Sequence, residues 1–199
     1  MLQSQIEINV IDAIHQRRSV RSYAPQKLTP ATIRSLLEAA VWAPTAVHEE
    51  PWAFVVVQDK AVLKSLSDRA KKIFTVEAEK PHAEQTRHLL DMLSNPDFNI
   101  FYDASTLIVI CARPKGIFVT ADCWLAAENL MLAAYAMGLG SCVIGFAVPA
   151  LNRAEIKAEL KIPAECSAIA PIIVGVPSGE TPRTTRREPD VLLWLPKAS

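Results

Sequence analysis

Five short apolar runs constrain the fold of this 199-residue chain more than any other feature. Short apolar runs of this kind are typical of buried strands. They are AFVVV at 53–57, which is rich in β-branched residues, STLIVICA at 105–112, SCVIGF at 141–146, SAIAPIIVGVP at 167–177 and DVLLWL at 190–195. Helical spacing is present at 8–17, 30–41, 60–93 with a break near Pro81, 122–138 and 152–160. Short strands separated by helices predict a single α/β or α+β sheet with helices packed against it.

Composition favours one well-packed domain. Half of the residues are hydrophobic, which suffices for a sizeable core. Twenty-one basic and 21 acidic side chains leave no net charge, so the chain lacks the basic field that nucleic-acid binding exploits. The helix at 122–138 is apolar on nearly all sides, yet it carries Asp122 and Glu128 and is too short for a membrane span. We expect this helix in the core or at a subunit interface, and we expect neither a nucleic-acid nor a membrane partner.

Cysteine and histidine spacing argues against metal and disulfide chemistry. Cys111, Cys123, Cys142 and Cys166 are far apart and form no C-x-x-C pair, so they are expected to be reduced core residues. The histidines at 15, 48, 82 and 88 show no metal-ligand spacing. The N-terminus mixes polar residues into its apolar positions and lacks the continuous apolar region of a signal peptide. These features predict a cytoplasmic protein without a metal site.

The last apolar run, at 190–195, follows a polar, arginine-rich segment that has no core of its own. A strand in this position can pair with the sheet of another chain, which predicts a homodimer with exchanged tails. We therefore expect one domain over residues 1–199, in which 181–199 is a C-terminal extension that reaches the partner subunit.

Arginine is concentrated in two short segments. HQRRSVRSY at 15–23 and PRTTRRE at 182–188 hold six of the eleven arginines. Guanidinium groups beside hydroxyls suit a phosphate, because the fork binds two oxygens and the hydroxyl completes the cage. The alternative is a solvated helix end, where arginines favour the C-terminal dipole. A dianionic phosphate is usually held from more than one segment, so we predict that the two clusters meet.

Other motifs exclude some chemistries and leave one loop open. GLGSCVIG at 138–145 has the wrong glycine spacing for a dinucleotide fingerprint and follows a helix instead of a strand. Walker A, G-x-S-x-G and H-E-x-x-H motifs are absent from the sequence. In APTAVHEEPW at 43–52, small residues around His48 would let a flat ligand come close. The alternative for this loop is a rigid turn in which Trp52 fills the core.

Four segments together resemble the FMN-dependent nitroreductase family. They are RRSVR at 17–21, APTAVHEEPWAFVVV at 43–57, AAENLMLAAYAMGLGSCVIGF at 126–146 and IIVGVPSGETPRTTRRE at 172–188. The resemblance covers nearly the whole chain. It implies an α+β, nitroreductase-like three-layer fold, with a central mixed, mostly antiparallel sheet flanked by helices. It also implies a domain-swapped homodimer with two FMN at the interface.

The resemblance implies a role for each arginine cluster. Arg17, Arg18 and Ser19 would hold the phosphate and ribityl end of FMN, and Arg187, helped by Arg186, would close the site from the C-terminal segment. Which of Arg183, Arg186 and Arg187 contacts the phosphate stays open. Thr185 stands where family members often have a basic residue, which puts one phosphate contact in doubt.

The remaining candidates would surround the flavin ring. Arg21 would face the pyrimidine edge, where its charge stabilises the anionic reduced flavin. Residues of the loop from the other subunit would line the ring, namely Pro44, Thr45 and Ala46, with His48 beside them. Ile144 and Gly145 would offer backbone N–H groups to the reactive nitrogen.

The implied activity is NAD(P)H-dependent ping-pong reduction of a small-molecule electron acceptor, a nitroaromatic or a quinone. NADH or NADPH would be the donor, and the flavin would carry the chemistry, so no catalytic acid or base is expected. His48 and Glu50 replace the Asn and Gln of many members, and H-x-E-P-W resembles the branch of flavin dehalogenases and flavin-destroying enzymes. The charged lid of deiodinases has no clear counterpart in 66–100. The alternatives are a flavin-sequestering or flavin-modifying protein and, third, a non-enzymatic anion-binding module.

Overall fold

The computed structural model describes residues 8–77, 91–114 and 116–195. These residues form a four-stranded sheet in the order β1-β2-β4-β3, with β1 (Trp52–Val57), β2 (Thr106–Ala112), β3 (Gly140–Val143) and β4 (Ser167–Gly175). All three pairs of neighbours are antiparallel. In the described part of the chain, parallel pairing is confined to an isolated bridge between Ser19 and Ser141. The predicted, mostly antiparallel sheet is therefore confirmed.

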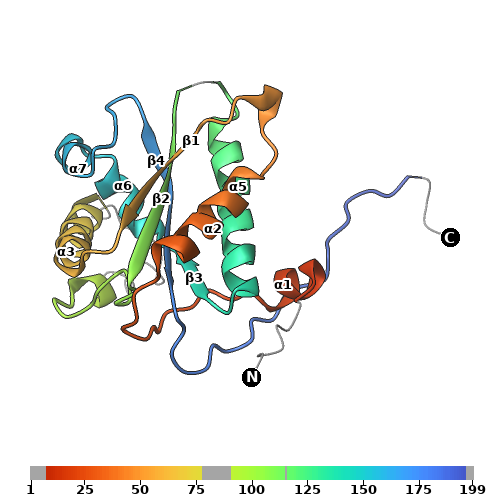
Figure 1. The fold of residues 1–199 in the computed structure, drawn as a ribbon, viewed down its shortest axis with the longest axis horizontal. Coiled ribbons are helices and arrows are strands. Elements are labelled where there is room, and N and C mark those ends of the chain that lie inside the picture. The colour runs from red at the N-terminus through yellow and green to blue at the C-terminus, as the bar shows by residue number, and fades with distance from the viewer. Residues whose placement is uncertain (1–7, 78–90, 115, 196–199) are drawn as a thin grey trace.

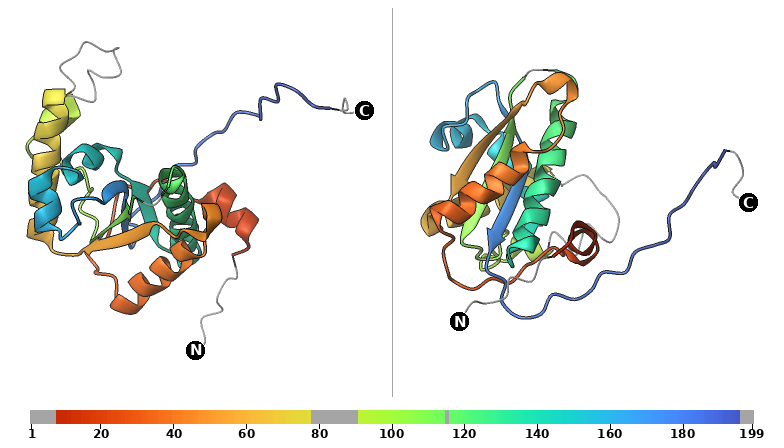
Figure 2. Two further views of the ribbon diagram at one scale, coloured as in Figure 1. Left: turned by 90° about the horizontal axis from the view of Figure 1, so that it is seen from above. Right: turned by 45° about the vertical axis from the view of Figure 1, so that its right-hand side comes forward.

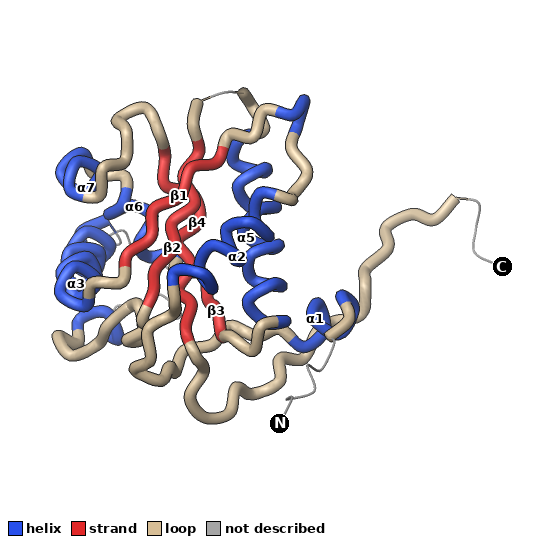
Figure 3. The backbone as a smooth tube through the Cα atoms, viewed as in Figure 1, coloured by secondary structure: helices blue, strands red, loops and turns tan. Residues whose placement is uncertain are grey.

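Helices cover both faces of the sheet and make three layers (Figures 1 and 3). One face carries α3 (Lys60–Glu77), α6 (Val148–Leu151) and α7 (Ala154–Glu159); the other carries α2 (Pro30–Val41) and α5 (Val119–Ala136). The short helix α1 (Val10–Gln16) contacts α5, and two 3-10 turns, η1 (Ala46–His48) and η2 (Gly145–Ala147), follow α2 and β3. The three-layer α+β architecture expected from the sequence is confirmed.

Strand β2 is buried along its whole length and divides the core in two. Leu107 and Val109 pack with the residues of the α3 side, whereas Ile108 and Ile110 pack with those of the α2 and α5 side. This follows from the strand geometry, in which successive side chains point to opposite faces. A strand with both faces covered is apolar along most of its length, which is why β2 shows no polar alternation after Thr106.

Local signals set several element boundaries. Helix α2 begins after Thr29, whose Oγ1 accepts a hydrogen bond from Thr32 N–H at 3.1 Å, with Pro30 in the first turn as predicted. Within the predicted helix at 60–93, the structure describes α3 over Lys60–Glu77 and helical residues at 91–94, and Pro81 lies outside the described residues. The strand predicted at 141–146 ends at Val143, because the chain then turns into η2.

Helix α5 buries one face and exposes part of the other. Cys123 and Leu130 are fully buried against the sheet, whereas Trp124 and Leu125 remain 42% and 46% exposed. The expectation of a buried helix therefore holds for one face of the single chain. All four cysteines are buried and free, which confirms the prediction made for them.

The segment after β4 leaves the body of the molecule and extends into solvent (Figures 1 and 2). Residues 181–195 are exposed and form no strand within the chain. Five apolar side chains of this tail are 55–94% exposed, and they are Val191, Leu192, Leu193, Trp194 and Leu195. A strand at 190–195 is thus not formed within the chain, and its pairing with a partner subunit stays a prediction. A search of the described helices finds none that is long and apolar enough to span a membrane.

Candidate functional site

The N-terminal segment 19–24 lies beside β3 and beside the chain that leaves β4. Val20 N–H donates to the carbonyl of Ser141 at 3.0 Å, and Ala24 N–H donates to the carbonyl of Val176 at 2.9 Å. Ser178 N–H returns a bond of 2.9 Å to the carbonyl of Ser22. These backbone bonds hold the start of the chain against the root of the C-terminal tail. They bring together the two arginine-rich segments, as the sequence predicted.

A cavity of about 550 Å³ lies between the two segments. Its cationic lining comes from both, with Arg17, Arg18, Arg21, Arg183 and Arg186. Hydroxyl groups complete the wall, from Ser19, Thr181, Thr184 and Thr185. The described residues that line it include no carboxylate. Five guanidinium groups with hydroxyls and no acidic side chain form a site for an anion of multiple charge.

Two arginines of this cavity have unused donors. The Nε atoms of Arg17 and Arg18 are buried and have no hydrogen-bond partner. Arg17 Nε lies 3.4 Å from Glu128 Oε1, and this ion pair is made without a hydrogen bond. Because a buried unsatisfied donor costs about 1–3 kcal/mol, a bound acceptor would relieve these atoms.

Arg18 also closes the end of α1. Its Nη1 donates to the carbonyls of His15 and Arg17 at 2.7 and 2.8 Å. The carbonyls of the last helical turn have no intrahelical partner, so a guanidinium there stabilises the helix terminus. Arg18 thus fulfils the helix-end alternative while it also lines the cavity.

On the C-terminal side, Arg183 and Arg186 line the cavity and Arg187 does not. The resemblance pointed to Arg187 as the main phosphate contact from this segment, and the choice among Arg183, Arg186 and Arg187 was left open. In the single chain, the first two are the arginines that meet the N-terminal cluster.

Arg21 joins the anion cavity to a second cavity of about 330 Å³. Its guanidinium lies over the ring of Tyr102, 5.9 Å from the centroid, and Tyr102 packs edge-to-face on Phe98 with 5.5 Å between ring centroids. Asp97 and Asp103 also line this cavity. Burial raises the pKa of Tyr102, and the Arg21 charge opposes that shift. The sequence analysis did not predict this aromatic side of the cavity. The signal in the sequence was the pair Phe98 and Tyr102, four residues apart in a polar stretch that precedes a strand.

The cysteine nearest to the arginines remains a thiol. Burial raises the pKa of Cys142, whereas Arg21, Ser19 and Arg17 act in the opposite direction. Burial also raises the pKa of the neighbouring Tyr23, whose hydroxyl donates to the carbonyl of Val20 at 2.7 Å. Both groups are therefore neutral near pH 7 and add no negative charge beside the cavity.

The structure separates the two residues expected to donate backbone N–H groups to the ring. Ile144 N–H is already bonded to the carbonyl of Pro171 at 2.8 Å. Gly145 is exposed, and a Cβ built on it would meet no atom within 4 Å. Of this pair, Ile144 has its N–H engaged within the chain, whereas Gly145 has open space where a side chain would lie.

The loop that holds Pro44, Thr45, Ala46 and His48 lies at the opposite end of the sheet from the arginines (Figure 1). It precedes Trp52, which pairs with Ala112, whereas Ser19 bridges to a residue at the other end of β3 and β4. One chain therefore does not bring this loop to the arginine cavity. The loop is folded tightly, and its left-handed residues are Val47, His48 and Glu50, with φ of 47°, 56° and 44°.

No group of three or more His, Cys, Asp or Glu side chains that could hold a metal ion is found in the described part of the chain.

Comparison with known proteins agrees with this geometry. A protein of Archaeoglobus fulgidus whose name includes "NAD(P)H nitroreductase" is 31% identical over 172 residues, 84% of each chain. The iodotyrosine deiodinase of Thermotoga neapolitana is 23% identical and is matched over 93% of its length and 89% of this chain. The crystal structure of a Bacteroides fragilis nitroreductase with bound FMN superposes with a TM-score of 0.79 at 26% identity, covering 94% of this chain and 98% of that one. The model of the nitroreductase family matches residues 14–176, a span that includes the first arginine cluster and the whole sheet. The chain belongs to the nitroreductase family.

Proposed function

We propose that this protein binds FMN and acts as an NAD(P)H-dependent oxidoreductase that reduces nitroaromatics, quinones or related small electrophiles. The observation that carries the proposal is the cavity on which both arginine clusters converge without a carboxylate. FMN ends in a dianionic phosphate, which is the charge that such a cavity selects. The family and the FMN named with the Bacteroides fragilis relative support the same ligand.

The residues present fit the phosphate end of FMN. Arg17 and Ser19 would hold it from the N-terminal segment, and Arg183 and Arg186 from the tail. The buried Nε donors of Arg17 and Arg18, which make no hydrogen bond, support this assignment, since an acceptor in the cavity would satisfy them. Arg187 does not line the cavity in the single chain, and we propose that it contacts the phosphate only if the tail takes a different path in the dimer.

Bound FMN would supply a two-electron store that accepts a hydride from NAD(P)H and gives it to the acceptor, with protons taken from water. The chain's own residues orient that group and set its electrostatics. Arg21, on the side of the cavity nearest Tyr102, would place a fixed positive charge at the pyrimidine edge. Gly145 would allow close approach of the ring, because nothing occupies the space where a Cβ would lie, and its backbone N–H is proposed to face the reactive nitrogen.

We further propose that the working unit is a homodimer with exchanged tails. The apolar side chains of 191–195 are exposed in the single chain, as are Trp124 and Leu125 on α5. Pairing of the tail with the partner would cover this surface. It would also bring Thr45 and Ala46, which lie far from the arginines of their own chain, to the flavin of the partner, with Pro44 and His48 beside them.

Two measurements test the proposal. Denaturation of the purified protein should release a yellow ligand with the absorbance and mass of FMN. The protein should then oxidise NADH or NADPH faster when a nitroaromatic or a quinone is added. Protein that carries no FMN and takes up none would contradict the proposal.

A second candidate is reductive dehalogenation or flavin modification. It is favoured by the likeness to the Thermotoga neapolitana deiodinase and by the H-x-E-P-W sequence at 48–52. Release of iodide from iodotyrosine under reducing conditions would support dehalogenation. A flavin-loaded protein that oxidises neither nicotinamide would instead support flavin sequestration.

A further inference from the structure

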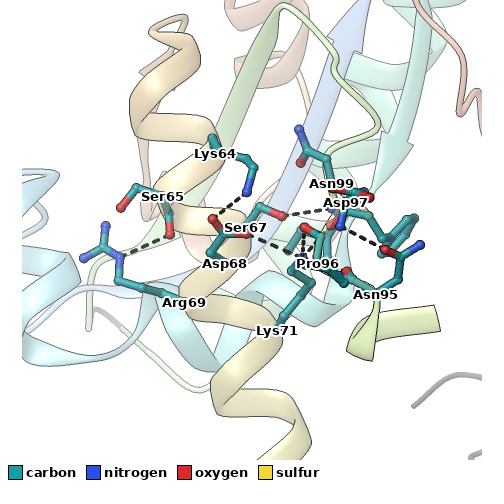
Figure 4. A network of polar contacts seen from close by, with 12 residues as sticks. Lys64, Ser65, Ser67, Asp68, Arg69, Lys71, Asn95, Pro96, Asp97 and Asn99 are labelled. Atoms are coloured by element: carbon teal, nitrogen blue, oxygen red, sulfur yellow. Dashed lines mark hydrogen bonds and ion pairs between the residues drawn. The ribbon is translucent and has the colours of Figure 1, made fainter. Parts of the chain in front are cut away.

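Lys71 is a buried cation on α3 whose donors are all directed at one loop (Figure 4). Its Nζ donates to the carbonyls of Asn95, Pro96 and Phe98 at 3.1, 3.2 and 2.7 Å. The side chain is 8% exposed, and Asp68 Oδ1 lies 3.4 Å from the same nitrogen. An ammonium group has three N–H donors, so three carbonyls and one carboxylate satisfy it fully.

A second tie lies one helical turn before Lys71. The Oγ of Ser67, which is fully buried, accepts a hydrogen bond from Ile100 N–H at 3.1 Å. Residues four apart lie on the same face of a helix, so Ser67 and Lys71 hold the loop together. Helix α3 thus fixes residues 95–100 at both ends of the segment.

This loop is the wall of the cavity beside Arg21. Phe98 lines that cavity and packs on Tyr102, and the Tyr102 ring lies under the Arg21 guanidinium. Tyr102 and Asp103 have φ of 51° and 55°, a backbone conformation that costs free energy in a residue with a side chain and persists only where the surroundings support it. The contacts therefore run without a gap from Lys71 through Phe98 and Tyr102 to Arg21.

We propose that Lys71 is a positioning residue for the Arg21 side of the site. Its ammonium group binds the carbonyls of Asn95, Pro96 and Phe98. These bonds hold Phe98 in place, and Phe98 supports the Tyr102 ring that packs against the Arg21 guanidinium. An apolar side chain of the same length would fill the space but remove the ammonium donor from three carbonyls, of which that of Asn95 would keep the Phe98 N–H at 3.2 Å. The consequence for the flavin rests on the proposed function, in which Arg21 faces the pyrimidine edge.

Hydrogen exchange tests the wall without any flavin. In Lys71→Met, the amides of 97–103 should exchange about tenfold to a hundredfold faster than in the wild type, because hydrogen bonds to a charged group are lost. Lys72→Met is the matched control, since Lys72 is the next residue of α3 and is exposed. Equal protection of 97–103 in Lys71→Met and Lys72→Met would overturn the proposal.

Chemical rescue separates the charge from the packing. In Lys71→Ala, propylammonium carries the three carbons and the nitrogen that the substitution removes, and it should restore protection of 97–103. Propan-1-ol matches its chain but not its charge and should not restore it. Equal rescue by both compounds would overturn the electrostatic part. If Lys71→Ala does not fold, the exchange comparison with Lys71→Met still decides the proposal.

The midpoint potential of bound FMN reports the effect of Lys71 on Arg21. With FMN bound, Lys71→Met should lower the flavin midpoint potential, because Arg21 loses its support and its charge moves away from the ring. FMN affinity should fall less than about threefold, since the side chains proposed to hold the phosphate, Arg17, Ser19, Arg183 and Arg186, are not altered. An unchanged potential, beside a loosened loop, would overturn the link to Arg21. Failure of the wild type to bind FMN would overturn the proposed function alone, because the exchange experiment still tests Lys71.

Discussion

The backbone N–H of Ala46 donates to Asp122 Oδ1 across 3.2 Å and joins the loop after α2 to the first turn of α5. Asp122 is 3% exposed, and its other oxygen, Oδ2, is buried without a hydrogen-bond partner. The amino end of a helix favours a carboxylate, which helps to keep this charge inside the protein. The loop proposed to line the partner's flavin is therefore tied by this hydrogen bond to the start of α5.

We expect Asp122→Ala to lower the free energy of unfolding by about 1.5–3 kcal/mol, the range for a hydrogen bond to a charged group. Asp122→Asn keeps an acceptor for Ala46 and should lose less than half of that. Urea unfolding of the wild type and both variants measures the difference. A loss below about 0.5 kcal/mol in Asp122→Ala would show that the loop does not depend on this bond.

Replacing Arg17 or Ser19 by alanine should weaken FMN binding by about tenfold to a hundredfold, because each change would remove one of the charge-assisted hydrogen bonds proposed for the phosphate. Arg34→Ala is the control, since Arg34 is an exposed arginine on α2, far from the cavity. Quenching of flavin fluorescence on titration gives the dissociation constants. Wild-type affinity in both site variants would sink the phosphate assignment.

Gly145→Ala should leave the fold intact and weaken the binding of FMN. Its Cβ meets no protein atom within 4 Å, so stability should change by less than about 0.5 kcal/mol while FMN affinity falls about tenfold. Gly140→Ala makes the opposite control, because a Cβ there would come 2.8 Å from three atoms of Val20 and destabilise the fold by about 1–3 kcal/mol. Thermal unfolding and FMN titration of the two variants separate the effects. Full affinity in Gly145→Ala would remove this glycine from the site.

Deleting residues 181–199 removes Arg183, Arg186 and the apolar tail together. We expect a colourless protein that is monomeric or aggregated, because the phosphate ligands and the proposed subunit contact are lost at once. Size-exclusion chromatography with detection at the flavin band measures both properties. A yellow, dimeric truncated protein would contradict the exchanged tail, and that is the result expected of a tail without a role.

Alkaline pH should destabilise the fold through its buried thiols. Burial raises the pKa of Cys111 to about 11 and that of Cys123 to about 12, above the ordinary value of 9.0. The folded state therefore favours the neutral thiols, so their contribution is complete below about pH 9 and is lost as the pH rises through the folded values. Urea unfolding between pH 7 and 10.5 should show the decline, with a shallower slope in Cys123→Ala. Identical slopes would assign the decline to other groups.

The parts of the fold that the sequence predicted are those governed by local chemistry. Runs of β-branched residues became β1, β2 and β4, and the Thr29 cap with Pro30 began α2 as expected. These signals depend on the preferences of neighbouring residues, which a sequence displays directly. The meeting of the two arginine clusters was also predicted, because a dianionic ligand is usually bound by cationic side chains from more than one segment.

Contacts between distant segments explain what the sequence did not predict. The N–H of Ile144 was assigned to the flavin, but the chain carries it within reach of the Pro171 carbonyl. Lys71 resembles any lysine of a charged helix, and only the path of residues 95–98 over α3 makes it a buried cation. The run at 190–195 has the composition of a strand, yet a strand needs a neighbouring edge, and the path of the tail carries this run into solvent away from the sheet (Figure 1).

The strand order has a consequence for how the protein is made on the ribosome. Strand β4 lies between β2 and β3, although it follows both in the chain, so β3 has no strand to pair with until β4 has been synthesised. The anion cavity then needs Arg17 from the start of the chain and Arg186 from near its end. A nascent chain therefore has no complete anion cavity until its tail has been synthesised. Translation that stops before the tail would give a product with the helices and the sheet but without the C-terminal arginines of that cavity.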